Sequence, residues 1–294
     1  MTVFKPYFFL VTPPLLWAGN MLVGRAVRND ILPLSLSFGR WLIALLVLLP
    51  FALPHIRRDL PRYRSQWPLI AATAVMGCAA FNTLVYTGLH STTGTNAILL
   101  NSCIPVLILL FGALFYRQPL HGRQIAGLAV SLTGVALIIL RADWQNLVRL
   151  QFNPGDLWVL AAVVCWALYT LWMKRIDPAV NRTGLTAVQI VIALAVLLPF
   201  WLWETARYGL PQPSPDALLA LAYVGLLPSV AAYLCYNAAI AHFGPVRAGL
   251  SIHLMPVFGT LMAVGLLGET LYAYHLLGIG AIFAGILLSS RTAP

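Results

Sequence analysis

Residues 43–51 read IALLVLLPF, and residues 192–200 read IALAVLLPF, the same nine-letter stretch with one change. The two copies lie 149 positions apart (192 minus 43) in a chain of 294 residues, so each half contains one copy. A repeat at this spacing indicates that the chain holds two copies of one structural unit. We therefore expect residues 1–146 to form a first unit and residues 147–294 to form a second.

The composition places both units in a membrane. Hydrophobic residues make up 60% of the chain and charged residues 9%, against about 25% charged residues in soluble domains. The chain contains apolar runs of about 20 residues, the length of a membrane-crossing helix, and they lack strand-like alternation. They predict an all-α integral membrane protein with ten transmembrane helices, at residues 8–26, 33–54, 67–89, 93–116, 121–140, 155–174, 184–204, 215–241, 246–268 and 273–290.

Further matching residues extend the repeat to all five predicted helices of each unit. The partners lie 149 to 151 positions apart: Trp17 with Trp166, Tyr86 with Tyr236, Gly94 with Gly244, Pro105 with Pro256, Gly127 with Gly278 and Gly134 with Gly285. Because five is an odd number, the second unit must enter the membrane from the opposite side. Inverted repeats are typical of secondary transporters, which bind substrate near the bilayer midplane between the repeats and expose it to each side in turn.

The net charge is +10, and the positions of the positive residues indicate how the chain is oriented in the membrane. With a cytoplasmic N-terminus, twelve of the 18 Lys and Arg residues fall in inner loops and termini: Lys5, Arg57, Arg58, Arg62, Arg64, Arg117, Arg123, Lys174, Arg175, Arg182, Arg247 and Arg291. The outer loops hold five: Arg25, Arg28, Arg141, Arg149 and Arg207. Because cationic residues gather on the cytoplasmic side, we expect a multi-pass protein of the bacterial inner (plasma) membrane with both termini inside, and no nucleic-acid partner.

Each half carries the same loose series of motifs. Residues 33–50 read PLSLSFGRWLIALLVLLP, and Tyr86, Pro105 and the glycine pair Gly127 and Gly134 follow. Residues 236–288 read YNAAIAHFGPVRAGLSIHLMPVFGTLMAVGLLGETLYAYHLLGIGAIFAGILL. By these features the chain resembles the EamA type of the drug/metabolite transporter superfamily over nearly its whole length. Within that superfamily it is most similar to the YddG-type aromatic amino acid exporters.

The resemblance implies a ten-helix basket around a central cavity. Helices 1, 3, 4, 6, 8 and 9 would line the cavity, and helices 5 and 10 would lie at one side. We expect small-residue packing faces on helices 5 and 10, from Gly127-x-x-x-Ser131 and Ala281-x-x-x-Gly285. One departure is visible in the family's G-E-x-L turn, where the second half keeps Glu269 but the first half has Gln118. If the acidic residue anchors a loop, the two gates of the transporter differ in strength.

Polar and aromatic residues fall on the helices that the resemblance assigns to the cavity. Asn82, Tyr86 and His90, for example, share one helix face at i, i+4 and i+8. The candidate substrate-binding residues are Trp17, Asn20, Arg40, Asn82, Tyr86, Asn101, Trp166, Tyr169, Tyr233, Tyr236, Asn237 and His253. The alternative for the polar residues is a hydrogen bond to a neighbouring helix, worth below about 1 kcal/mol on average. For the two tryptophans the alternative is the interfacial aromatic belt.

Arg40 is the one charged residue deep in a predicted helix. It lies about 10 Å along the helix from Pro33, at a depth where a functional or network role is the default. Two roles stay open: contact with a substrate carboxylate, or a tie to loop carbonyls in one conformational state. Pro105 and Pro256 interrupt matching helices, and such interruptions free carbonyls toward a transport site, so we expect both prolines to shape the path.

Several chemistries are missing from the sequence. All eight Asp and Glu residues fall at helix ends or in loops, so no intramembrane carboxylate offers a proton or sodium site. His253 could couple transport to protons, but a hydrogen-bonded packing role is simpler. The four cysteines and six histidines show no metal-ligand spacing, and there is no phosphate-binding loop or paired catalytic carboxylate. We expect no enzymatic activity, no cofactor and no metal.

The sequence therefore predicts a secondary transporter that exports amino acids, aromatic and other neutral or small ones, and related metabolites by alternating access. The alternative is an exporter of drugs or other small metabolites with proton antiport, because aromatic walls also bind amphiphilic cations. A membrane enzyme lacks its catalytic set, and an ion channel lacks charged rings or a carbonyl filter. The expected partners are a small-molecule substrate and membrane lipid, and a monomer suffices.

Overall fold

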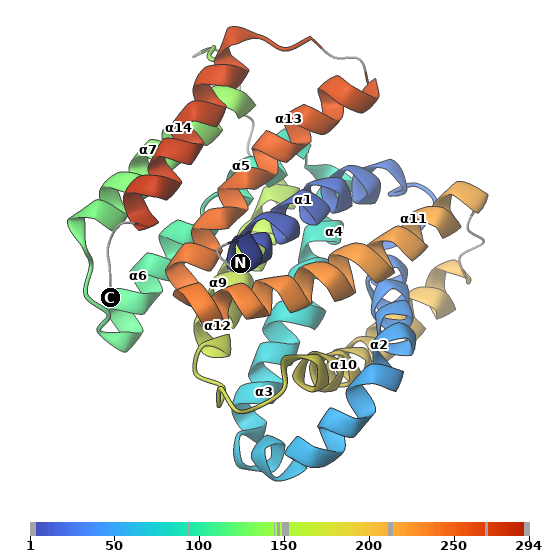
Figure 1. Cartoon of the computed structure of the whole chain (residues 1–294). Helices are drawn as coiled ribbons and strands as arrows, with labels where there is room; N and C mark the ends of the chain where they lie inside the picture. Colours follow the sequence, from blue (N-terminus) through green and yellow to red (C-terminus); the bar gives the residue numbers. More distant parts are fainter. Residues whose placement is uncertain are drawn as a thin grey trace.

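The computed structural model of the chain describes residues 4–92, 94–143, 145, 148, 153–210, 214–267 and 270–290. Within these ranges the chain consists of helices and short connections and contains no strand. The helices, drawn in Figure 1, are α1 (Phe4–Ala26), α2 (Pro33–Ser65), α3 (Trp67–Thr73), η1 (Ala74–Ala80), α4 (Phe81–Ser91), α5 (Gly94–Asn101), α6 (Ile104–Tyr116), α7 (Gly122–Ile139), α9 (Pro154–Met173), α10 (Arg182–Tyr208), α11 (Pro215–Leu226), η2 (Leu227–Ala231), α12 (Ala232–Leu250), η3 (Ser251–His253), α13 (Leu254–Leu267) and α14 (Ala273–Ser290).

Eight helical segments of the described ranges are long and apolar enough to cross a membrane. The longest, Pro215–Met262, has 48 residues and is interrupted at Gly244, whose φ of 81° and ψ of 167° are not helical. The segment Ala273–Ser289 is apolar but shorter. The chain is therefore an all-helical, multi-pass membrane protein.

The helix α2 is longer than the sequence predicts. The apolar run ends near residue 54, yet α2 continues to Ser65 through Pro54 and Pro61. Its 33 residues extend about 50 Å, more than the hydrocarbon core of about 30 Å. Four arginines predicted in an inner loop therefore lie on α2 instead: Arg57, Arg58, Arg62 and Arg64. The prediction was wrong because a fall in hydropathy marks the edge of the membrane and need not mark the end of a helix.

The regular α-helix is interrupted at matching places in the two halves. The π-helical segments η1 and η2 lie about 150 residues apart, on the third and eighth predicted helices. Two residues separate α5 from α6, and the 3-10 segment η3 directly precedes α13. Pro105 is the second residue of α6 and Pro256 the third residue of α13, so both prolines lie next to a break. Such segments are common at functional sites.

Helices α2 and α10, which carry the two copies of the nonapeptide, pack against each other in opposite directions. Near the end of α10, the Glu204 carboxylate accepts hydrogen bonds from the backbone N–H of Leu34 and Ser35 at the start of α2, at 3.1 and 2.8 Å. Near the end of α2, the Asp59 carboxylate accepts from the Asn181 N–H at the start of α10, at 2.8 Å. An acid on each helix therefore satisfies free backbone donors at the start of the other.

Helices α7 and α14 form a second close pair, which lies at one side of the molecule (Figure 1). Gly127 faces Gly285 and Gly134 faces Gly278, so closely that a Cβ atom on any of the four would lie within 3 Å of the opposite helix. The small-residue packing faces expected from the sequence are confirmed, and close approach of this kind is how helices associate in lipid. Gly127 therefore faces the repeat partner of Gly134, and Gly134 faces the repeat partner of Gly127.

Candidate functional site

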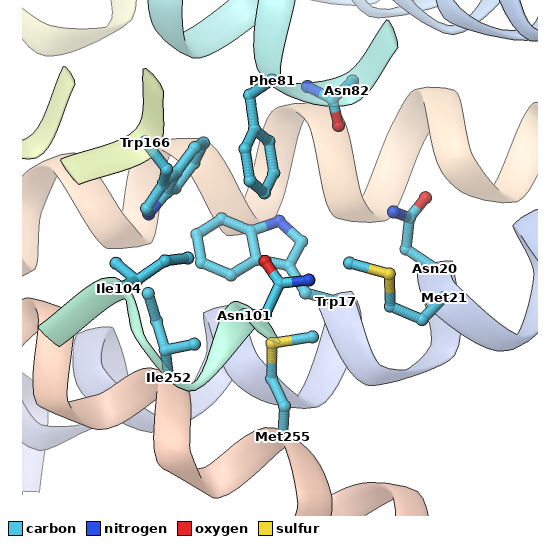
Figure 2. Close-up of a pocket in the computed structure, with 10 residues that line it drawn as sticks. All are labelled: Trp17, Asn20, Met21, Phe81, Asn82, Asn101, Ile104, Trp166, Ile252 and Met255. Carbon is cyan, nitrogen blue, oxygen red and sulfur yellow. The ribbon is translucent and has the colours of Figure 1, made fainter. Parts of the chain in front are cut away.

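A small cavity lies among helices of both halves (Figure 2). Ten residues line it: Trp17, Asn20 and Met21 of α1, Phe81 and Asn82 of α4, Asn101 of α5, Ile104 of α6, Trp166 of α9, Ile252 of η3 and Met255 of α13. Its volume of about 20 Å³ is room for about one water molecule, against roughly 300–1,000 Å³ in ligand pockets. In this conformation the cavity is therefore too small to hold an organic ligand.

The cavity has a polar and an apolar side. Figure 2 shows the amides of Asn20 and Asn82 on one side and Trp166, Ile104 and Ile252 on the opposite side. Such an arrangement can orient a small molecule that carries a polar group at one end and an apolar group at the other.

The apolar side is held by aromatic contacts. The Trp166 ring lies 5.0 Å from the Trp17 ring, edge to face, and 4.5 Å from the Phe81 ring, measured between centroids. Tyr233 and Tyr236 pack against the same indole at 5.4 and 5.3 Å. Because each aromatic pair contributes about 0.5–1.5 kcal/mol beyond burial, these contacts fix the orientation of the indole that faces the cavity.

Arg40 lies behind the polar side and is fully buried. Its Nε donates to Ser229 Oγ at 2.8 Å, and its Nη1 donates to Asn82 Oδ1 and to the Tyr86 hydroxyl, both at 2.6 Å. The Tyr86 hydroxyl in turn donates to Asn20 Oδ1 at 2.9 Å. The guanidinium is therefore one hydrogen bond from the Asn82 side of the cavity and two from the Asn20 side.

The second half contributes a network without formal charge. The Tyr169 hydroxyl donates to Asn237 Oδ1 at 2.6 Å, and Asn237 Nδ2 donates to Thr186 Oγ1 at 3.3 Å. The indole N–H of Trp166 donates to the Tyr236 hydroxyl at 3.3 Å. These neutral hydrogen bonds link α9, α10 and α12 beside the apolar side of the cavity.

Carbonyl groups of the two π-helical segments accept hydrogen bonds from aromatic side chains. The bonds join the Tyr233 hydroxyl to Gly77 O (2.6 Å), Trp41 Nε1 to Cys78 O (2.8 Å) and Trp17 Nε1 to Pro228 O (3.2 Å). Cys78 and Pro228 are 150 residues apart, so the carbonyl at the same repeat position accepts from an indole in each half, although Trp41 and Trp17 are not repeat partners. The irregular segments therefore position the aromatic rings around the cavity.

The twelve predicted binding residues divide into three groups. Five line the cavity: Trp17, Asn20, Asn82, Asn101 and Trp166. Six belong to the networks directly behind it: Arg40, Tyr86, Tyr169, Tyr233, Tyr236 and Asn237. The twelfth, His253, lies outside the lining: its Nδ1 is 2.7 Å from Ser131 Oγ, and its Nε2 is 3.0 Å from Ser102 O. These contacts are of the kind expected for a hydrogen-bonded packing role, the simpler of the two roles considered for His253.

The structure also differs from the expected lining. The resemblance places the eighth predicted helix, residues 215–241, in the cavity wall. None of the described lining residues belongs to α12, which forms part of that helix; its tyrosines pack behind the tryptophans instead. Of the residues of the G-E-x-L turns, Gln118 is exposed after α6, and Glu269 lies outside the described residues.

Five apolar lining residues were missed from the sequence: Met21, Phe81, Ile104, Ile252 and Met255. An apolar side chain that faces a cavity has the same sequence signature as one that faces lipid. Only the position of each residue next to a predicted polar residue or to one of the two prolines could have indicated it. In the part of the chain that the structure describes, no cluster of three or more His, Cys, Asp or Glu residues could hold a metal ion.

A multi-pass helical membrane chain with a closed amphipathic cavity between its halves has the architecture of a small-molecule transporter. The EamA-like transporter family model matches residues 4–140 and, a second time, residues 153–291. The chain belongs to this family.

Several relatives and a solved structure resemble the chain over most of its length. It is 25% identical to an uncharacterized transporter of Archaeoglobus fulgidus, with 97% of each chain covered. It is 27% identical to a probable terminal-alkyne amino-acid exporter of Streptantibioticus cattleyicolor, with 99% of this chain and 95% of the relative covered. A probable amino-acid metabolite efflux pump of Escherichia coli is 25% identical over 62% of each chain. A crystal structure at 20% identity shares the fold, with a TM-score of 0.77 over 97% of this chain and 96% of the other.

Proposed function

We propose that the protein exports amino acids, aromatic and other neutral or small ones, and related metabolites across the bacterial inner membrane by alternating access. In this proposal two inverted repeats of five helices, residues 1–146 and 147–294, enclose the cavity. Both termini are cytoplasmic.

Three features support ten membrane crossings. Seven of the eight candidate spans are single crossings; the eighth, Pro215–Met262, is long enough for two crossings separated at Gly244. The shorter apolar segment Ala273–Ser289 supplies the tenth. The antiparallel pairs α2–α10 and α7–α14, each of which joins repeat partners, are what a twofold axis in the membrane plane would produce.

The amphipathic cavity is the observation that carries the substrate proposal. Amides on one side suit the charged backbone groups of an amino acid, and the indole of Trp166 with its apolar neighbours on the other suits the side chain. Two of the relatives are named as a probable amino-acid exporter and a probable amino-acid metabolite efflux pump.

The small volume of the cavity supports alternating access. A cavity of about 20 Å³ cannot hold an amino acid, so substrate must bind a state in which the halves have moved apart. Its lining comes from five predicted helices of both halves, so a rocking motion of one half against the other would enlarge it.

The described lining contains no acidic group that could bind a coupling ion. This favours a facilitated carrier driven by the substrate gradient. The same aromatic residues would suit amphiphilic drugs, so a drug or metabolite exporter with proton antiport is the second candidate. His253 would have to leave its contacts with Ser131 and Ser102 to carry a proton in that mechanism.

Transport by proteoliposomes tests the proposal. Liposomes containing the purified full chain are loaded with labelled tryptophan, phenylalanine, threonine or lysine, and efflux is measured with and without an imposed pH gradient. We expect efflux of the aromatic amino acids in the absence of a pH gradient. Movement of a cationic dye with no amino acid would refute the substrate class, and a strict need for the gradient would refute the uncoupled mechanism.

A further inference from the structure

We propose that Arg40 and the amide of Asn20 form a carboxylate-binding site on the polar side of the cavity. This inference rests on the proposed transport of small metabolites and restricts it. The substrate must carry a carboxylate, and an analogue with a neutral group in place of the carboxylate is rejected.

The first observation is a buried cation without an anion. The side chain of Arg40 is 0% exposed, and its hydrogen-bond partners are neutral: Ser229, Asn82 and Tyr86, with the ring of Trp41 5.2 Å away. No ion pair of the described chain includes it. Because a guanidinium cannot lose its proton in a protein, its charge stays in the membrane interior, where charges normally pair.

The second observation is an unused donor group. Arg40 Nη2 is buried and has no hydrogen-bond partner. Nε gives its one hydrogen to Ser229 and Nη1 gives its two to Asn82 and Tyr86, so the two N–H bonds of Nη2 are the remaining donors of the guanidinium. A carboxylate oxygen that accepts from Nη2 would complete the hydrogen bonds of the guanidinium and supply the missing anion.

The third observation is the direction of the amides. Arg40 can only donate, so the Tyr86 hydroxyl accepts from it and gives its single hydrogen to Asn20 Oδ1. Asn82 Oδ1 likewise accepts from Arg40. Both amides therefore keep their oxygens toward the arginine and turn their NH2 groups elsewhere: Asn82 Nδ2 donates to the Tyr233 hydroxyl at 3.0 Å, and Figure 2 shows the Asn20 nitrogen on the side of the other lining residues.

The arginine network thus leaves Nη2 of Arg40 and the NH2 group of Asn20 as donors, whereas the N–H bonds of Asn82 are directed to the Tyr233 hydroxyl and the Cys78 carbonyl. Donors backed by a positive charge favour an anion and disfavour a cation or a second donor. When the halves move apart, a carboxylate can bind Asn20 Nδ2 and Arg40 Nη2. The ammonium group of an amino acid would then lie away from Arg40, near acceptors such as Asn101 Oδ1.

The test compares phenylalanine with phenylalaninamide, which differ only in the replacement of the carboxylate by a neutral amide. Binding to the purified full chain is measured by the ligand-dependent shift of its thermal unfolding. We expect the wild-type chain to bind phenylalanine about 10- to 100-fold more tightly, the range for charge-assisted hydrogen bonds. The variant Arg40→Gln should reduce this preference to within about 2-fold.

Glutamine is the appropriate replacement because it occupies the matching position of the other half, Gln189. Arg123→Gln is the matched control, because it removes an exposed cation far from the cavity and should keep the full preference. An unchanged preference in Arg40→Gln would overturn the proposal. Should that variant not fold, the wild-type chain decides: equal affinity for the two ligands would overturn the proposal without any substitution.

The result is independent of the proposed amino acid transport. Phenylpropionate, which has the carboxylate but no ammonium group, should also stabilise the wild-type chain and fail to stabilise Arg40→Gln. If proteoliposomes move no amino acid and phenylpropionate still binds through Arg40, the proposed function fails and the carboxylate site stands. If amino acids and their amides are transported and bound equally well, the function stands and the site fails.

Discussion

Helices α2 and α10 share an apolar sequence and differ at a fully buried polar position near its start. Arg40 of α2 and Gln189 of α10 are 149 residues apart, three positions before the shared nonapeptide in each half, and both are fully buried. Arg40 has three neutral partners and reaches the cavity through two of them. Gln189 donates to Thr73 Oγ1 at 2.7 Å, and its Oε1 has no partner.

The difference teaches that the two halves kept a common backbone and divided the chemistry. The paired acids at the helix ends, the π-helical segments and the facing glycines occur in both halves, whereas the fully buried arginine occurs in one. One arginine gives the cavity a polar direction that a symmetric pair could not give.

The largest expected effect comes from moving the charge to the other half. Gln189→Arg would bury a guanidinium beside Thr73 and Met173, without the acceptors that surround Arg40. We expect a loss of about 3–5 kcal/mol in the free energy of unfolding, the cost of an uncompensated buried charge. Equilibrium unfolding in detergent measures it.

Gln189→Met is the control for this substitution. It removes the amide and the unpartnered Oε1 at similar volume, so its effect should remain within about 1 kcal/mol. A stable Gln189→Arg variant would show that the second half can also house the cation, and the contrast between α2 and α10 would not hold.

The next prediction tests the region where the halves are alike. In Gly127→Leu the new side chain would collide with the backbone of Gly285 and Ser289 on α14, and we expect a loss of about 3 kcal/mol from overpacking. Gly122→Leu, at the start of the same helix, meets nothing within 4 Å and should be tolerated. Gly278→Leu should match Gly127→Leu, since the two glycines are repeat partners. Unequal losses would mean that the duplication does not extend to this pair.

These two pairs also show what could be predicted from the sequence. The glycine faces of α7 and α14 follow from spacing alone, because small residues four apart are visible in any membrane helix. Arg40 was recognisable because charge is rare at that depth. The π-helical segment η1 was not recognisable, since its one unusual residue, Gly77, is of a type common in membrane helices; in η2 the local signal was Pro228. The role of Asn20 depends on the hydrogen that Tyr86 donates, a long-range contact that no sequence pattern encodes.

The smallest expected effects concern the acids that join α2 to α10. Glu204 is buried and accepts from Leu34 N, Ser35 N and Ser35 Oγ, so Glu204→Gln should cost about 1–2 kcal/mol, as loss of a charged helix cap does. Asp59 accepts from one backbone N–H and pairs with Arg58 and Arg62, whose side chains are 61% and 45% exposed. Because exposed ion pairs contribute little, Asp59→Asn should cost about 1 kcal/mol or less.

High salt should affect the substitutions of Asp59 and Glu204, the acids at the two ends of the α2–α10 pair, differently. Exposed charges are screened at high ionic strength and buried ones much less, so unfolding in about 1 M salt should shrink the Asp59→Asn effect and leave the Glu204→Gln effect nearly unchanged. The two acids are both buried and would then perform the same backbone function with different dependence on salt, because only Asp59 pairs with exposed arginines. Equal salt sensitivity would instead mean that the exposed arginines add nothing to the role of Asp59.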